Sequence, residues 1–361
     1  MGKIKNINLE ETFSIAVANH RQNKIKKAQI LYNKILKANP NHSQVLNNLG
    51  VIFGQSGDYQ KAMSYYENVI KINPNYVDAH NNLGTIYINL KEYQKAKDCY
   101  ENAIKINPNY ADAHYNLGNT FKDLEENEKA KVCYEKTIEI NPNHINAHNN
   151  LGTLFLNLKE YQIAKDYFKK AIEINPNYVD AHNNIAIAFK ALEEHYKAIS
   201  HYEKVLQIDH GNIHAINSLS ALLGLYKVDH NSEADKTNFK KLILLLFKKN
   251  DIKPIHLAKN ARLLLLSDNE SRNLLKIINS ESSLLSNEVV KKLLKEELFY
   301  LILQKSLFAD IFWEKLLNKL RSEILFNLEN SNKNILNEFL FFIISLAEQC
   351  WLNEYIYTQS E

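Results

Sequence analysis

The sequence predicts an all-α protein, a right-handed solenoid of stacked helix pairs followed by a further helical domain. Its 361 residues contain six prolines, and five of them recur every 34 residues. Between successive prolines, apolar side chains recur at helical spacing, and no run alternates apolar and polar residues as a half-buried strand would. Repeated helical units without any strand are therefore expected. The recurring prolines are Pro40, Pro74, Pro108, Pro142 and Pro176.

The repeat frame divides the chain into three parts. Six helix pairs fill residues 9–212, and a partial seventh pair begins at Ile213. We expect a short N-terminal tail at residues 1–8, a solenoid over residues 9–226 and a helical C-terminal domain over residues 227–361.

Each unit predicts two helices. The Asn-Pro-Asn sequence at each boundary is turn-forming, so it ends one helix and leads into the next. In the first helix, positions 3, 4, 7, 8, 11 and 14 share one arc, which we expect to pack against the second helix. Position 8 is glycine in four units, which costs roughly 1 kcal/mol of helix propensity and predicts a close helix approach. These glycines are Gly50, Gly84, Gly118 and Gly152.

The last third of the chain is also helical in pattern. No glycine follows Gly224, so this part contains no phosphate-binding glycine loop and no nucleophile elbow. Glu296 and Glu297 are adjacent and diverge by about 100° on a helix, so we interpret them as solvated charges rather than a catalytic pair. The periodicity predicts helices at residues 237–250, 254–267, 270–279, 287–306, 311–327 and 335–357.

The repeated sequence resembles the tetratricopeptide repeat. The resemblance rests on the period of 34, the LG…Y/F…A…Y…A…P pattern and the two-helix unit, and it covers roughly the first 226 residues. The segments NPNYVDAHNNLGTIY and NPNYADAHYNLGNTF are most similar to the repeats of O-linked N-acetylglucosamine transferases. That similarity implies an asparagine ladder on the concave side of the superhelix.

The arc opposite the packed one, which includes positions 5 and 6, is the candidate ligand-binding surface. An asparagine amide offers both a donor and an acceptor, which suits the backbone of an extended peptide. The alternative is that position 6 caps or bridges neighbouring helices, or reflects an asparagine-rich composition. The residues are Asn48, Asn82, Asn116, Asn150 and Asn184 at position 6, and Asn47, Asn81, Tyr115, Asn149 and Asn183 at position 5.

The charge and the cysteine and histidine positions argue against nucleic acid, membrane and metal as partners. A net charge of +3 gives no field that would favour nucleic acid or an anionic membrane. The three cysteines form no CxxC motif, and the recurring histidines are about one repeat apart, too far to share a metal ion. We therefore expect no cofactor and no metal, a cytoplasmic location and a protein or peptide partner. The histidines are His80, His114, His148 and His182.

The C-terminal segment is rich in apolar and aromatic side chains. Phe341, Trp351, Tyr355 and Tyr357 predict an interface for a partner or a following domain. This region loosely resembles the helical region that precedes the methyltransferase domain of some tetratricopeptide-repeat proteins, although it carries no cofactor motif.

Two functions are compatible with these features. In the first, the chain is a scaffold that recruits partners or substrates through an Asn-lined concave groove. In the second, it is the substrate-presenting part of a larger transferase, a methyltransferase or an O-GlcNAc-type glycosyltransferase, whose catalytic domain lies outside this sequence. No catalytic motif is found in the chain itself.

Overall fold

A computed structural model describes residues 8–225, 233–247, 261, 264–266, 268–279, 283–305 and 311–329. Within these ranges the regular elements are α-helices and no strand occurs, as the sequence predicts. The chain divides into two compact units, Met1–Ala181 and His182–Glu361. The boundary predicted between solenoid and C-terminal domain, at residues 226 and 227, lies outside the described residues and stays a prediction.

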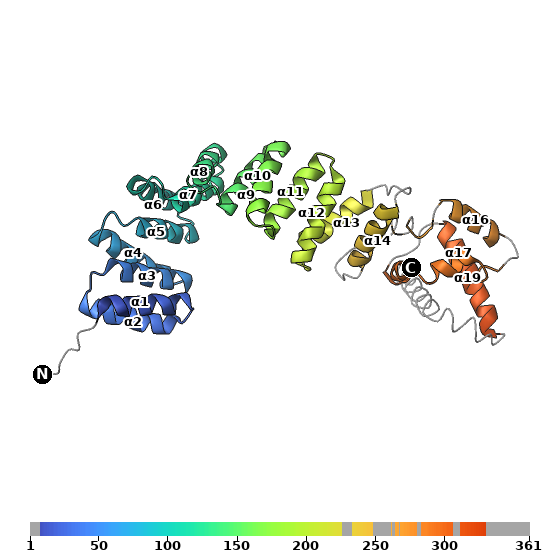
Figure 1. The fold of residues 1–361 in the computed structure, drawn as a ribbon, viewed down its shortest axis with the longest axis horizontal. Coiled ribbons are helices and arrows are strands. Elements are labelled where there is room, and N and C mark those ends of the chain that lie inside the picture. The colour runs from blue at the N-terminus through green and yellow to red at the C-terminus, as the bar shows by residue number, and fades with distance from the viewer. Residues whose placement is uncertain are drawn as a thin grey trace, which may run out of the picture. The chain divides into compact units, whose positions relative to one another are not determined.

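Five helix pairs form the first unit (Figure 1). The pairs are α1 (Leu9–Arg21) with α2 (Ile25–Ala38), α3 (Ser43–Gln55) with α4 (Tyr59–Ile72), α5 (Val77–Asn89) with α6 (Tyr93–Ile106), α7 (Ala111–Asp123) with α8 (Asn127–Ile140), and α9 (Ile145–Asn157) with α10 (Tyr161–Ile174). Helices α2, α4, α6 and α8 each also contact the first helix of the next pair, so the apolar core continues from pair to pair within the first unit. The division between the units falls inside α11 (Val179–Ala191).

The second unit continues the 34-residue frame and then leaves it. Its helices are α12 (His195–Ile208), α13 (Ile213–Leu225), α14 (Glu233–Phe247), α16 (Asp268–Ile278), α17 (Glu288–Leu293), α18 (Glu297–Lys305) and α19 (Ile311–Glu329). Of the helix expected at residues 254–267 only four residues are described, and the helix expected at 335–357 lies outside the described residues.

The single helix predicted over residues 287–306 is instead two helices, α17 and α18. The N–H of Glu296 donates to the carbonyl of Leu293, which closes a turn between them. The Glu296 side chain forms an ion pair with Lys240 of α14. The Glu296 side chain therefore has a structural role, because it links the start of α18 to α14.

Within each pair, a missing side chain on the first helix admits a ring from the second. A Cβ built at Gly84 of α5 would lie 2.7 Å from Cε1 of Tyr100, closer than real Cβ atoms come. Gly118 meets Tyr134 at the same distance, and Gly152 meets Phe168. The prediction that these glycines allow a close helix approach is confirmed.

The turns between helices are formed by residues with positive φ and by asparagines that accept backbone hydrogen bonds. Each first helix of the first unit ends just before a residue with positive φ, such as Gly57 (φ 81°) or Lys91 (φ 59°). Each Asn-Pro-Asn turn is closed by its first asparagine, as where Oδ1 of Asn73 accepts from the N–H of Asn75 at 3.1 Å.

The recurring histidines brace these turns. Nε2 of His80, His114 and His148 lies 2.9 Å from the carbonyl oxygen of Pro74, Pro108 and Pro142, respectively. Each histidine therefore ties the start of its helix to the preceding turn. In the described part of the chain, no three His, Cys, Asp or Glu side chains are grouped so that they could hold a metal ion.

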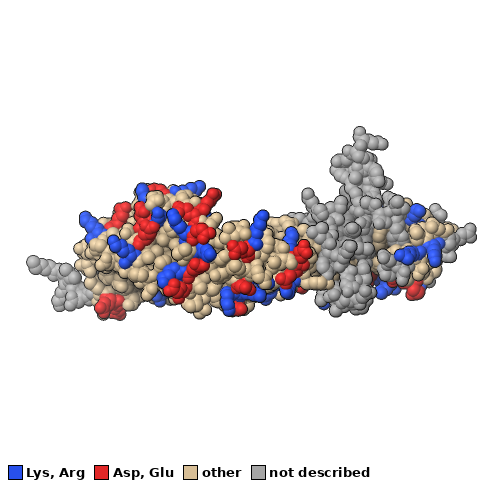
Figure 2. All heavy atoms as spheres, turned by 90° about the horizontal axis from the view of Figure 1, so that it is seen from above, with Lys and Arg blue, Asp and Glu red and all other residues tan. Residues whose placement is uncertain are grey.

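Two surface properties bear on function. On the face seen in Figure 2, acidic and basic side chains are interspersed over the described helices. Such a surface lacks the single-sign patch that nucleic-acid backbones require. None of the described helices has both the length and the apolar character needed to cross a membrane.

Candidate functional site

The asparagines of consecutive first helices bond to one another. Nδ2 of Asn82 on α5 donates to Oδ1 of Asn47 on α3 at 3.2 Å. One unit later, Nδ2 of Asn116 on α7 donates to Oδ1 of Asn81 on α5 at 3.0 Å. A position-6 amide thus reaches back 35 residues to the position-5 amide of the preceding unit. The face of α3, α5, α7 and α9 that carries positions 5 and 6 is called the ladder face below.

Where the earlier amide is missing, the donor finds a tyrosine. Position 5 of α1 is Phe13, which cannot accept, and Nδ2 of Asn48 instead donates to Oη of Tyr32 at 3.2 Å. Asn150 on α9 donates to Oη of Tyr115 at 3.3 Å and to Oδ1 of Asn119 at 2.9 Å. Both N–H groups of Asn150 are therefore used within the protein.

Positions 5 and 6 differ in exposure. Asn47, Asn81 and Asn149 are each only 7% exposed. Asn82 and Asn116 are partly exposed. Each of these two makes one side-chain bond, so among the residues that the structure describes one N–H and the Oδ1 of each amide have no partner. The ladder face thus buries one row of amides and presents a second row.

A second polar row, which the sequence analysis did not single out, lies at the helix starts. Oη of Tyr110 donates to Oδ1 of Asp78 at 2.8 Å, and Oη of Tyr178 donates to Oδ1 of Asn146 at 2.9 Å. Burial, together with the nearby Asp180 carboxylate, raises the pKa of Tyr178 to about 12. These phenols therefore stay protonated at neutral pH. The signal in the sequence is the recurring NPNY segment.

The sequence profile of the tetratricopeptide repeat matches five consecutive stretches of the chain, residues 43–76, 77–110, 111–144, 145–178 and 179–212. Residues 43–212 are tandem tetratricopeptide repeats. The matched stretches begin where α3, α5, α7, α9 and α11 begin, so the ladder residues occupy the first helix of each repeat.

Several solved structures share this repeat fold. PilF of Pseudomonas aeruginosa is 17% identical, covers 58% of this chain and 96% of its own, and has a TM-score of 0.54. The APC/C hetero-tetramer Cut9–Hcn1 is 18% identical, with coverage of 60% and 43% and a TM-score of 0.53. YrrB, described as a TPR protein with an unusual peptide-binding site, is 21% identical, with coverage of 52% and 96% and a TM-score of 0.43. Comparison with curated proteins found no match.

The last repeat carries the final ladder residues, on α11 in the second unit. Asn184 is partly exposed. Oδ1 of Asn183 is buried and accepts no hydrogen bond. The residue 35 positions later is Ser218, whose shorter side chain has no amide N–H to donate. The ladder therefore ends at an unused acceptor.

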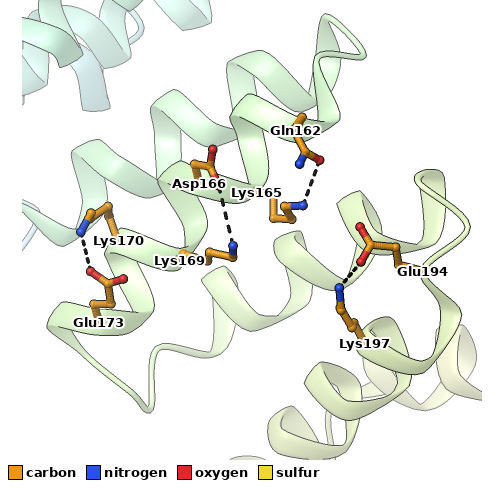
Figure 3. Close-up of polar contacts among 8 residues, drawn as sticks. All are labelled: Gln162, Lys165, Asp166, Lys169, Lys170, Glu173, Glu194 and Lys197. Carbon is orange, nitrogen blue, oxygen red and sulfur yellow. Dashed lines mark hydrogen bonds and ion pairs between the residues drawn. The ribbon is translucent and has the colours of Figure 1, made fainter.

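The second helices of the repeats carry solvated charge. On α10, Lys170 lies 2.7 Å from Glu173, and Lys169 lies 3.8 Å from Asp166 (Figure 3). On α12, Lys197 pairs with Glu194. Pairs three residues apart on an exposed helix add little stability, and this face carries no concentration of one sign.

The two cysteines of the repeats are unreactive by their surroundings. Burial raises the pKa of Cys99 to about 12 and that of Cys133 to about 11. Both thiols are thus neutral at physiological pH and unsuited to nucleophilic chemistry. The predicted interface residues Phe341, Trp351, Tyr355 and Tyr357 lie outside the described residues.

Proposed function

We propose that this chain is a scaffold that holds an extended segment of a partner protein along the ladder face. One observation carries the proposal. Asn82 and Asn116 each present an unbonded N–H and an unbonded oxygen on a partly exposed side chain. An amide with both groups free matches the C=O and N–H of a peptide backbone and ignores the ligand's side chains.

The repeat spacing supports an extended ligand. Packed helices lie about 8–10 Å apart, and an extended chain advances about 3.3 Å per residue. One position-6 amide therefore meets about every third residue of the ligand. Each such bond contributes only about 0.5–1.5 kcal/mol, because water competes for the same groups. Useful affinity thus requires several repeats acting together.

The asparagines at positions 5 and 6 have different roles in this proposal. Position 5 is buried and accepts a bond from the next repeat, so its role in the proposal is to orient position 6. Both N–H groups of Asn150 already donate within the protein, so this side chain can contact a ligand only through Oδ1. We therefore place backbone capture at Asn48, Asn82 and Asn116, with a weaker contribution from Asn150.

The other expectations belong to the same proposal. A neutral, amide-rich face suits a protein ligand better than nucleic acid or a membrane. The scarcity of cysteine suits a reducing, cytoplasmic compartment. Phe341, Trp351, Tyr355 and Tyr357 are proposed as a second contact surface for a partner or a following domain.

The transferase alternative shares the same ladder face. In it, the bound peptide is the substrate of a methyltransferase or O-GlcNAc-type glycosyltransferase domain outside this sequence. It rests on the sequence resemblance alone, so the scaffold function is the one we favour.

Photo-crosslinking tests the proposal directly. A crosslinkable amino acid at exposed Thr85 on α5 samples the ladder face, whereas the same group at Ile163 on α10, 42% exposed, samples a second helix. Partners captured from lysate and sequenced by mass spectrometry should crosslink from residue 85 through unstructured segments. Equal yields from both sites would contradict the proposal.

A further inference from the structure

A pocket of about 510 Å³ lies in the first unit among α6, α7 and α8, and it is lined by residues of α7 other than positions 5 and 6. Its walls are mainly apolar. The residues that matter below are Ile104 and Lys105 of α6, His114 and Leu117 of α7, and Val132 and Cys133 of α8.

Two other repeats of the first unit fill the corresponding place with a tyrosine ring, whereas α6 has Cys99 there. The seventh residue of the second helix is Tyr65 in α4, and its ring stacks on Phe53 with centroids 5.5 Å apart. In α10 it is Tyr167, stacked on Phe155 at 5.6 Å. The Tyr167 ring also lies 6.2 Å from His148, which is only 6% exposed.

In α8 the same position is Cys133, which has no ring to offer. His114, the counterpart of His148, is correspondingly only partly buried and lines the pocket. The pocket therefore adjoins the place that corresponds to the Tyr167 ring in α10. A thiol whose pKa burial raises to about 11 is neutral, so Cys133 forms an apolar wall.

One charge at the rim is unbalanced. Lys136 lies 2.7 Å from Glu139, and Glu101 lies 3.9 Å from Lys97. Lys105 is exposed and pairs with no carboxylate among the described residues. An occupant with an apolar body and a negative end would thus satisfy both the walls and the rim.

We propose that this pocket is a binding site for a small aromatic carboxylate, with its ring in the space left by Cys133 and its carboxylate near Lys105. The site is separate from the ladder face, and it requires no peptide ligand. Val132, which is 63% exposed, forms an apolar lip that the ring would partly cover.

The test uses 4-phenylbutyrate as the probe and 4-phenylbutanol as its neutral counterpart, each titrated into the full chain by isothermal calorimetry and amide chemical shifts. Cys133→Tyr should weaken phenylbutyrate binding at least tenfold, because it restores the ring found in α10. The matched control is Cys99→Tyr, one repeat earlier and outside the pocket lining, which should bind as wild type does.

A separate comparison tests the role of the Lys105 charge. Phenylbutyrate should bind about two- to fivefold more tightly than phenylbutanol, the size expected for one exposed ion pair, and Lys105→Gln should remove that preference. Melting temperatures of both tyrosine variants establish that they fold. Equal binding by wild type and Cys133→Tyr would overturn the proposal, as would the absence of shifts at the lining residues up to millimolar probe.

Discussion

The side chain of Asn116 donates to that of Asn81 at 3.0 Å, and this bond joins the first helices of two successive repeats. It realises the bridging role that the sequence left as an alternative. It does not use up the amide, because Asn116 keeps one N–H and its Oδ1. The same residue type can therefore hold neighbouring repeats in register and still present hydrogen-bonding groups to a ligand.

The end of the ladder gives a direct test of this bridge. Ser218→Asn should supply the donor that the buried Oδ1 of Asn183 lacks. A satisfied buried acceptor is worth about 0.5–1.5 kcal/mol, so the variant should melt a few degrees higher. Ser218→Ala, which supplies no donor, is the control and should gain nothing. A Ser218→Asn protein no more stable than Ser218→Ala would count against the bridge.

Replacing the glycine at position 8 by alanine should destabilise the protein. A Cβ at Gly118 would lie 2.7 Å from Tyr134, and overpacking of this kind costs about 1–3 kcal/mol, more than the roughly 1 kcal/mol gained in helix propensity. Gly118→Ala should lower the free energy of unfolding in urea. Gly54→Ala is the matched control, since its Cβ would meet the flexible end of Ile86 at 3.1 Å and Cβ of Ala62 at an ordinary 3.9 Å. If both variants are equally stable, the close approach is not what selects glycine.

The turns within repeats contain removable backbone strain. Lys159 has φ 63°, a conformation that costs a side-chain-bearing residue about 1–2 kcal/mol. Lys159→Gly should therefore raise the free energy of unfolding by roughly 0.5–1 kcal/mol after the entropy cost of glycine. Gly57→Ala, at the equivalent φ of 81° with no atom within 4 Å of its Cβ, should lower it. Thermal melts that move in the same direction for both would contradict this reading.

A histidine pair makes the second unit sensitive to acid. The Nδ1 atoms of His182 and His201 lie 2.9 Å apart, so one nitrogen carries the proton and the other accepts it, and the bond is lost when both rings are protonated. Burial, with the His182 ring adding to it, lowers the pKa of His201 from 6.5 to about 4. The folded state thus binds fewer protons than the unfolded chain between these values. Stability is complete above pH 6.5 and falls as the pH drops toward 4.

The size of this effect can be measured by urea unfolding at pH 7.5 and pH 5.0. The full shift corresponds to about 2 kcal/mol, and because solvent screens part of the ring we expect a loss of about 1 kcal/mol. His201→Tyr should reduce the loss, because tyrosine occupies the same place as Tyr65 and Tyr167 and does not titrate there. An unchanged pH dependence in the variant would assign it to other groups.

The helix pairs were predictable because one strong period fixed the boundaries and one arc fixed the packing. The prediction was incomplete, because it assigned only one buried arc to each first helix. Position 10 lies outside the predicted arc, yet Ile86 is only 4% exposed, and Asn81 on the opposite arc is only 7% exposed. The reason is that α5 packs against its own second helix α6, the preceding second helix α4 and the neighbouring first helices α3 and α7. More than one face is therefore buried.

Other features needed three-dimensional information. The bond from Tyr110 to Asp78 joins residues 32 apart, and the recurring NPNY segment marks the tyrosine but does not identify its partner. The turn between α17 and α18 falls inside an uninterrupted apolar pattern and depends in part on Lys240, 56 residues away. Such tertiary contacts override the periodicity on which sequence reasoning relies.

The central claim is that position 6 contacts the ligand while position 5 supports it. Two triple variants separate these roles, Asn48→Ala/Asn82→Ala/Asn116→Ala and Asn47→Ala/Asn81→Ala/Asn149→Ala. Both remove bonds between side chains, so both should melt earlier than wild type. Binding of a captured partner's extended peptide is then measured by calorimetry well below either melting temperature. The position-6 variant should lose about 10- to 1,000-fold in affinity, from three bonds of about 0.5–1.5 kcal/mol each, and the position-5 variant less than tenfold. Equal losses in the two variants, or no loss in either, would contradict the account.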